Sequence, residues 1–359
     1  MPNLNTKIAE ELISHLHDIV AFTNGEIKEL VSILNKAHEQ TLEEVAKLEA
    51  KGITEARVQR VNKAILEAYN EAKVVYQNEL YDSSFGLMKN EVAIGSNLLT
   101  ESIPVKLDLL KPSASLLKRL VKDTPISIGK NQTITAPSFL ESLFGIGSES
   151  VVNEVKYGII NGRTPSQIVR KLKGTAINNG KDGDLFNLFN KKTESFVRTA
   201  NISYTNEARQ SLYQENADII KGEKVDATLD TRTCQICANY DNKVTLWNKQ
   251  GEIYQDGLNG ARPPFHYNCR CVLVPITRSW KDLGLDKDDL PELTRSSMDG
   301  EVPQDTTYAD WFDKQPRKRQ IEILGESRYE LYKNGLPINK FANNGKTFTL
   351  KELEARGKK

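Results

Sequence analysis

All four cysteines of this 359-residue chain lie between residues 234 and 271, in two short motifs. The first motif is a C-x2-C knuckle formed by Cys234 and Cys237. The second is H-x2-C-x-C, which contributes His266, Cys269 and Cys271. A disulfide scaffold distributes its cysteines over a short secreted chain, and this chain does not have that character. The clustering therefore predicts that two separate segments are held together at one closed knot.

The residue types in these motifs favour a structural zinc site. Such a site takes four Cys or His ligands in a tetrahedron, and a knuckle supplies two thiolates from one tight turn. The five candidates compete for four positions, and their spacing does not choose between them. Two other states are consistent with the same residues: a reduced cluster without metal, held by packing and by Pro263 and Pro264, and a disulfide formed after release from the cell. A catalytic zinc is disfavoured, because it needs an open position and a nearby general base, and the chain has no H-x-E or H-E-x-x-H pattern.

The first hundred residues are the second informative region, because their apolar residues recur at helical spacing. The repeat is interrupted at Gly52 and Thr54, and polar residues fill the other positions. We therefore expect residues 1–100 to be an amphipathic helical region, folded as a hairpin or lever that offers surfaces to partners. The apolar positions that carry the repeat are Ile27, Leu30, Val31, Leu34, Leu42, Val45 and Leu48, and then Val58, Val61, Ile65, Ala68, Tyr69, Ala72, Val75 and Tyr76.

The rest of the chain divides into three further regions, and the overall expectation is an α+β fold. Closely spaced prolines and glycines predict an irregular connecting region at residues 101–147. Residues 148–280 are expected to form a small α+β module, in which helices precede a sheet that carries the cysteines. Residues 281–359 are expected to form a linker and a helical tail. Within the module, a capping box at Thr164 predicts a helix start, and a regular apolar stripe predicts a helix over 193–220. Alternating runs predict strands at 224–229, 243–247 and 271–275.

Composition and charge argue against several classes of function. The chain has 49 Lys and Arg against 48 Asp and Glu, a formal charge of +1, so a generally basic nucleic-acid coat is not expected. A basic patch at Lys314–Arg319 is either a local phosphate contact or a solvated helix face. No apolar run approaches the ~18–20 residues of a spanning helix. Residues 1–12 lack the apolar core of a secretory signal, so we expect synthesis in a cytoplasm. No Walker-type or Rossmann-type loop and no G-x-S-x-G elbow occurs.

Two acidic features near the cysteines have a structural and a functional interpretation. Asp230 and Arg232 precede the knuckle. They either cap its turn and form a local salt bridge, or act as an acidic catalytic or metal group with a phosphate-binding partner. The structural interpretation is preferred. The acidic run at Asp286–Asp289 lacks the glycine and the final carboxylate of a calcium loop, so it is expected to be a solvated turn.

Three stretches of the chain, taken together, resemble one known family. They run from Phe196 to Arg209, from Leu229 to Cys237 and from Pro263 to Cys271, and the last ends in the sequence H-x-N-C-R-C. Their order and spacing are similar to those of the phage Mu protein F-like family of minor head, or head morphogenesis, proteins over roughly residues 150–276. The tail from Trp311 to Arg328 is similar to the extension often found after this domain. The chain departs from the pattern at Asp241-Asn242, where an Asp-Gly turn is expected.

The resemblance implies a minor capsid protein of a tailed bacteriophage. Its implied partners are the portal protein, the scaffolding or major capsid protein, and viral DNA, with no membrane. The implied location is the virion, in the capsid interior or near the portal, after a stage in the host cytoplasm during assembly; some such proteins enter the cell with the DNA. A competing hypothesis is enzymatic, since some members are fused to toxin or transferase domains. In that case Asp230, Arg232 and His266 would form a metal-dependent, nuclease-like centre.

Overall fold

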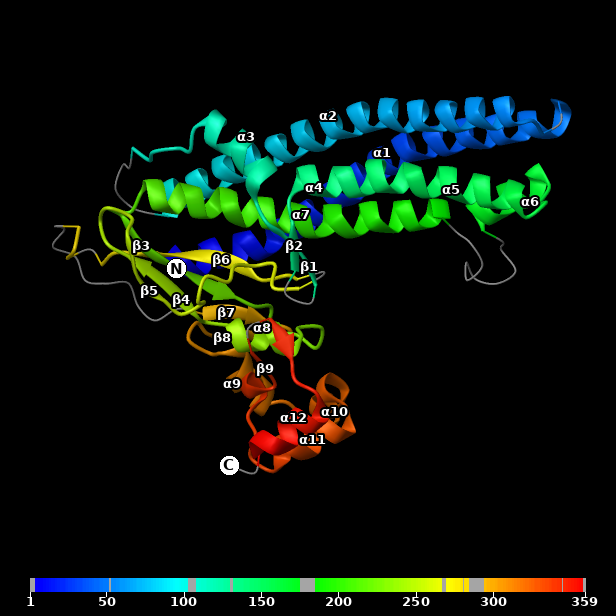
Figure 1. Cartoon of the computed structure of the whole chain (residues 1–359). Helices are drawn as coiled ribbons and strands as arrows, with labels where there is room; N and C mark the ends of the chain where they lie inside the picture. The colour runs from blue at the N-terminus through cyan, green and yellow to red at the C-terminus, as the bar shows by residue number, and fades with distance from the viewer. Residues whose placement is uncertain are drawn as a thin grey trace.

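The computed structural model describes residues 4–51, 53–102, 108–129, 132–174, 185–266, 269–279, 281–283, 294–343 and 345–357. Long helices lie side by side, a small sheet lies near one end of them, and a group of short C-terminal helices projects beyond the sheet (Figure 1). The N-terminus lies beside the sheet, and the C-terminus lies at the far end of the C-terminal group. None of the described helices is long and apolar enough to cross a lipid bilayer.

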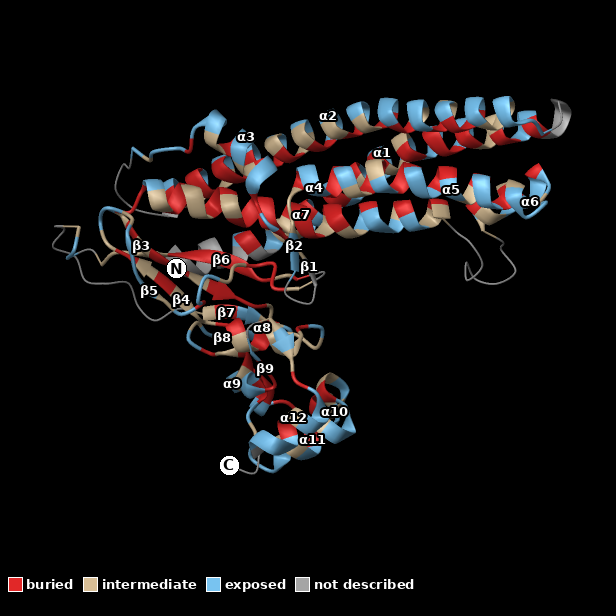
Figure 2. Cartoon of the chain, in the orientation of Figure 1, coloured by how far each residue is buried: buried red, intermediate tan, exposed pale blue. Residues whose placement is uncertain are grey.

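The N-terminal region is a hairpin of two long helices. Helix α1 runs from Leu4 to Lys51 and helix α2 from Glu55 to Ser102. The break predicted around Gly52 and Thr54 is confirmed, because the Thr54 carbonyl accepts the first backbone hydrogen bonds of α2. Buried positions follow the facing sides of the two helices, while the outer side of α2 is exposed (Figure 2). The helical periodicity of the sequence therefore marks the contact between the two arms.

A third long helix, α7 (Leu185–Glu215), packs against both arms of the hairpin. It begins before the helix predicted at 193–220 and ends earlier. The capping box of α6 is confirmed, since Thr164 and Gln167 bond each other's backbone N–H. The connecting region 101–147 contains short helices, as expected, together with a small strand hairpin that the sequence did not predict. The shorter elements of this layer are α3 (Ala114–Asp123), β1 (Ile126–Gly129), β2 (Gln132–Ile134), α4 (Ala136–Leu140), the π-helix η1 (Glu141–Ile146), α5 (Gly147–Ile160) and α6 (Pro165–Lys173).

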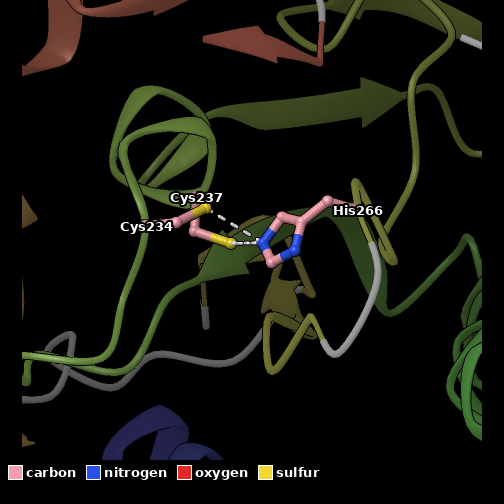
Figure 3. A group of neighbouring side chains, drawn as sticks. All are labelled: Cys234, Cys237 and His266. Carbon is pink, nitrogen blue, oxygen red and sulfur yellow. Dashed lines mark hydrogen bonds between the residues drawn. The ribbon is translucent and has the colours of Figure 1, made fainter. Parts of the chain in front are cut away.

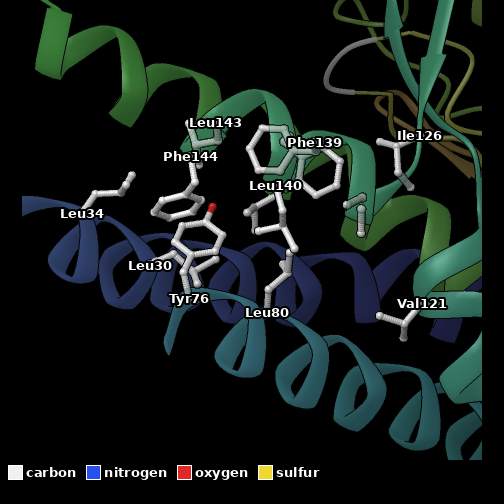
Figure 4. Close-up of a cluster of buried hydrophobic side chains, with 14 of the residues drawn as sticks. Leu30, Leu34, Tyr76, Leu80, Val121, Ile126, Phe139, Leu140, Leu143 and Phe144 are labelled. Carbon is white, nitrogen blue, oxygen red and sulfur yellow. The ribbon is translucent and has the colours of Figure 1, made fainter. Parts of the chain in front are cut away.

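One hydrophobic core joins the hairpin to these later helices. Figure 4 shows side chains of α1 and α2 meeting those of α4 and η1. The rings of Tyr76 and Phe144 meet edge to face with centroids 5.2 Å apart, and Phe139 stacks on Phe196 at 3.9 Å. Each fully buried side chain of this size stabilises the fold by roughly 1.5–3 kcal/mol relative to an exposed one. The hairpin is thus an integral part of the packing around α7.

The sheet has four antiparallel strands in the order β5-β4-β3-β6. Helix α7 and the first part of α1 pack against it, with Leu16 of α1 beside Val272 and Val274. Three strands lie within a few residues of the predicted runs, whereas β5 was not predicted, because its first three residues are all exposed and show no alternation. The strands are β3 (Ile220–Asp226), β4 (Val244–Trp247), β5 (Ile253–Asp256) and β6 (Val272–Thr277).

The C-terminal group has its own cluster of buried apolar residues, centred on Trp311, Phe312 and Phe341. The helical tail expected after residue 281 is present, with two small strand pairs in addition. Its elements are β7 (Thr294–Ser297), β8 (Gly300–Pro303), α9 (Tyr308–Asp313), α10 (Arg317–Leu324), α11 (Glu326–Lys333), the 3-10 turn η3 (Ile338–Lys340), β9 (Ala342–Asn343), β10 (Lys346–Thr347) and α12 (Leu350–Gly357). The acidic run at residues 286–289 lies outside the described residues.

Candidate metal centre

The two cysteine motifs are brought together by the short helix α8 (Gln235–Tyr240) and by the segment that leads into β6. Cys234 is the N-cap residue of α8, and Cys237 lies in its first turn. Cys271 directly precedes β6, and His266 and Cys269 lie in the loop before it. Strand β3 precedes α8 in the chain and pairs with β6 in the sheet. Backbone pairing between these two strands therefore holds the two motifs near each other.

All five predicted ligands lie at this one place. The His266 Nε2 atom is 3.0 Å from the sulfur of Cys234 and 2.9 Å from that of Cys237 (Figure 3). The sulfurs of Cys237 and Cys269 are 3.7 Å apart. The ligand atoms form two triads that share Cys237: one with Cys234 and His266, and the other with Cys269 and Cys271. The four cysteines are free thiols, and the predicted knot is therefore held without a disulfide.

These groups could hold a metal ion, and the donor set suits zinc. With Zn–S bonds of about 2.3 Å, two thiolates of a tetrahedral site lie about 3.8 Å apart, close to the separation of Cys237 and Cys269. The His266 imidazole lies roughly half an ångström closer to its two sulfurs than in such a site. This closer distance suits a hydrogen bond between thiol and imidazole. Binding of a metal by four ligands would need an outward shift of His266 and a closer approach of Cys269 or Cys271 to the first triad, because the two triads share only Cys237.

The thiols of the cluster divide into two pairs with opposite pKa shifts. A hydrogen bond with Cys237, together with His266, lowers the pKa of Cys234 to about 4 in spite of burial. Burial raises the pKa of Cys269, but hydrogen bonds with Cys237 and Cys271 outweigh it and bring the pKa well below its usual range. The hydrogen bond with Cys234 raises the pKa of Cys237 well above its usual range. For Cys271 the bond with Cys237 lowers the pKa, yet Cys269 and burial together raise it. Metal binding requires deprotonated thiols, and the lowered pKa values of Cys234 and Cys269 favour that form.

Asp230 links the two motifs through an ion pair. Its carboxylate accepts two hydrogen bonds from the Arg270 guanidinium, both 2.7 Å, and Arg270 lies between Cys269 and Cys271 in sequence. The same carboxylate accepts the backbone N–H groups of Arg232 and Thr233 at 2.9 and 3.0 Å, so it also caps the turn before the knuckle. The structural interpretation of Asp230 is supported. Its main partner is Arg270, whereas the Arg232 side chain is 79% exposed and lies 3.8 Å from Asp230.

A second buried carboxylate fixes the other side of α8. Asp241 accepts the backbone N–H of Ala227 at 2.8 Å and that of Tyr308 at 2.7 Å. It also pairs with the buried guanidinium of Arg295, which bonds Asp226 as well. The departure from the family pattern at the next residue is accommodated, because Asn242 takes a φ of +60°, in the left-handed region that glycine favours. The turn after the knuckle therefore keeps the geometry that an Asp-Gly pair would give.

The space around the cluster is small. A cavity of about 10 Å³ lies beside Cys234, Cys237, His266 and Arg270, and this is about enough for one water molecule. Such a cavity can take an ion or a water but has no room for a nucleotide. Among the described residues, the carboxylate of Asp230 is occupied by Arg270 and backbone N–H groups. The arrangement suits a closed, structural centre.

Polar residues of α7 position the module, and sequence reasoning recognised them only as part of the family-like stretch. Asn206 accepts the backbone N–H of Leu273 at 3.3 Å and donates to the Pro263 carbonyl at 3.4 Å, so it holds the two ends of the His266 loop. Arg209 donates to Glu91 of α2 at 2.6 Å. Asn201 donates to Glu26 of α1 at 2.6 Å. Helix α7 is thus the element that ties the cysteine module to the hairpin.

The fold and the centre define a helical protein with a small antiparallel sheet whose two cysteine motifs are joined at a closed Cys/His cluster. Residues 149–274 match the family model described as phage Mu protein F like protein. This stretch includes α7, the sheet and all five predicted ligands, so the resemblance is confirmed for this part of the chain. The match covers about a third of the chain and makes this part similar to a family of phage head morphogenesis proteins. Searches of curated proteins and of solved structures found no match.

Proposed function

We propose that this protein is a minor capsid protein that associates with the portal and the procapsid during assembly of a tailed phage head. The observation that carries the proposal is the family match over residues 149–274. The closed cluster and its small cavity support a role in assembly over a role in catalysis. Scaffolding or major capsid protein and viral DNA are further proposed partners.

We also propose that the cluster binds one structural zinc ion. Cys234, Cys237 and His266 would supply three ligands, and Cys269 or Cys271 the fourth. Zinc would contribute Lewis-acid charge that holds the remaining thiols as thiolates, and it would tie α8 to the segment before β6. The ion pair between Asp230 and Arg270 already holds the same two segments, so it would keep the ligands near their places in the metal-free chain.

The outer side of the α1–α2 hairpin is the proposed docking surface for the portal. Val74 and Val75 of α2 are 61% and 56% exposed although their neighbours Ala72 and Tyr76 are buried. Exposed aliphatic side chains on a long helix suit helix-in-groove contacts with a protein partner. Removal of the hairpin would not test this docking, because its buried face is part of the core around α7.

Point variants on the outer face give the sharper experiment. Val74→Glu with Val75→Glu should reduce the amount of protein that co-purifies with portal or procapsids in an assembly reaction. The matched control is Asn70→Glu with Asn78→Glu, which adds the same charge at exposed positions of the same helix. Equal incorporation of both variants would refute docking through this face. A mass-spectrometric census of purified virions tests the location itself, and absence of the protein from virions would refute the proposed function.

A further inference from the structure

Three lysines converge on two aromatic rings where α3 packs beside α2. The Lys122 ammonium lies 5.5 Å from the centre of the Tyr81 ring. Those of Lys118 and Lys89 lie 5.1 and 5.6 Å from the centre of the Phe85 ring. The rings are half-buried and the three lysines are exposed. Attraction between an ammonium and a ring face restrains the long side chains, which lowers the entropic cost of holding them in one row.

This surface also lacks the neutralising partners that some other lysines of the long helices have. In α1 and α2, Lys47 pairs with Glu44, Lys63 with Glu67, and Lys73 reaches Glu141. Within the described residues, no ion pair involves Lys89, Lys118 or Lys122.

The chain from residue 111 to 122 adds to the same charge. It contains Lys111, Lys118, Arg119 and Lys122, and the first carboxylate that follows is Asp123, the last residue of α3. Leu116 and Leu120 line a separate groove on another side of α3, together with acidic residues of α7. The row of lysines lies on the side of α3 that meets α2. The chain is net-neutral as a whole, so this side of α3 is a local concentration of lysines that have no ion-pair partner among the described residues.

We propose that this surface, defined by Lys89, Lys118 and Lys122 with Tyr81 and Phe85, binds the phosphate backbone of duplex DNA. Tyr81, Phe85 and Lys89 are four residues apart in turn, so the row spans about 12 Å along α2. One strand of duplex DNA presents a phosphate about every 3.4 Å along its axis, so about three or four phosphates face a row of that length. The contact is expected to be independent of base sequence, because its charged groups are lysine ammoniums that pair with phosphate oxygens. The inference rests on the proposed location in the head, where packaged DNA is the abundant polyanion.

The test is the salt dependence of binding between the full-length protein and a short fluorescein-labelled duplex, followed by anisotropy from about 50 to 200 mM NaCl. The patch variant carries Lys89→Gln, Lys118→Gln and Lys122→Gln. The control variant carries Lys28→Gln, Lys36→Gln and Lys156→Gln at exposed positions elsewhere, with the same change in net charge. Matching circular dichroism melts of the three proteins establish that folding is unchanged.

We expect the patch variant to bind about tenfold or more weakly. Its slope of log affinity against log salt should be shallower by about three, since each lost phosphate contact contributes about 0.9. The control should keep both the affinity and the slope of the wild type. Equal behaviour of patch and control variants, or failure of the wild type to bind duplex at the lowest salt, overturns the inference. This outcome is separate from the virion census: protein found in virions whose patch variant binds like the control refutes the DNA surface and leaves the head location intact.

Discussion

Glu26 offers a direct test of how the three long helices are held together. This residue of α1 is 5% exposed, and its carboxyl group faces α2 and α7. It accepts a hydrogen bond from Asn201 at 2.6 Å, but one of its oxygens has no partner, and among the described residues no cation pairs with it. Burial raises the pKa of this carboxyl to about 7, although hydrogen bonds with Asn201 and Ser83 act in the opposite direction.

The sign of the effect follows from the raised pKa. The folded chain holds the Glu26 proton more tightly than the unfolded chain, whose ordinary value is 4.5. The free energy of unfolding therefore falls as the pH rises from about 4.5 to 7, and the full cost is present above pH 7. At about 1.4 kcal/mol per pH unit, the difference between the two pKa values corresponds to about 3 kcal/mol. With an unfolding entropy of about 2.1 cal/mol/K per residue, this is about 4 °C in Tm for a chain of this length.

Glu26→Gln keeps the shape of the side chain and removes the charge. At pH 8.5 we expect the variant to unfold about 4 °C above the wild type in scanning calorimetry, and at pH 4.5 the two should nearly coincide. Glu29→Gln, at an exposed position one turn further along α1, is the control and should show no such pH-dependent gap. A Gln variant that is less stable than the wild type at both pH values would show that the carboxylate is compensated, and the reasoning would be wrong.

Three further predictions concern the cysteine module. Cys234→Ser with Cys237→Ser should lower the zinc content below one ion per chain in elemental analysis and lower the Tm; unchanged values for both would contradict a structural metal. Arg295→Ala should lower the free energy of unfolding in urea by about 3–5 kcal/mol, because it leaves buried carboxylates unpaired. The control Arg232→Ala, at an exposed position, should change it by no more than about 0.5 kcal/mol. Similar losses of stability in the two variants would refute the buried pairing. Asn242→Gly should be more stable than Asn242→Ala by about 1 kcal/mol, since both lose the same amide and only glycine adopts a positive φ without strain; equal stabilities would show that the turn does not need that conformation.

The helical part of the fold was predictable because it rests on local signals. A repeat of apolar residues at helical spacing, an interruption at Gly52 and a capping box at Thr164 each act within a few residues of the chain. The start of α7 was missed, since Leu185 follows residues with no periodic pattern. The strand β5 was missed for a related reason: it is an edge strand with exposed residues, so burial imposes no alternation on its sequence.

The candidate site was predictable in its residues and less so in its supports. The C-x2-C and H-x2-C-x-C motifs identified all five side chains that meet, because thiolate and imidazole chemistry is visible in residue type and spacing. The choice of Arg270 over Arg232 as the partner of Asp230 was not, because it depends on how the chain returns from residue 230 to residue 270. The same holds for Asn206 and Arg209, whose partners lie far away along the chain.

The core shared by the hairpin and α7 restricts how such a gene can be recombined. The family match begins at residue 149, yet the hairpin contacts helix α7 of the matched stretch, where His38 stacks on Phe186 and Tyr69 meets Phe189. A chimera that imports residues 149–274 from a distant phage would place foreign side chains against an unaltered hairpin. Exchange between phage lineages should therefore succeed when the hairpin and the module come from the same parent. Chimeras whose hairpin and module come from different parents should accumulate as insoluble protein.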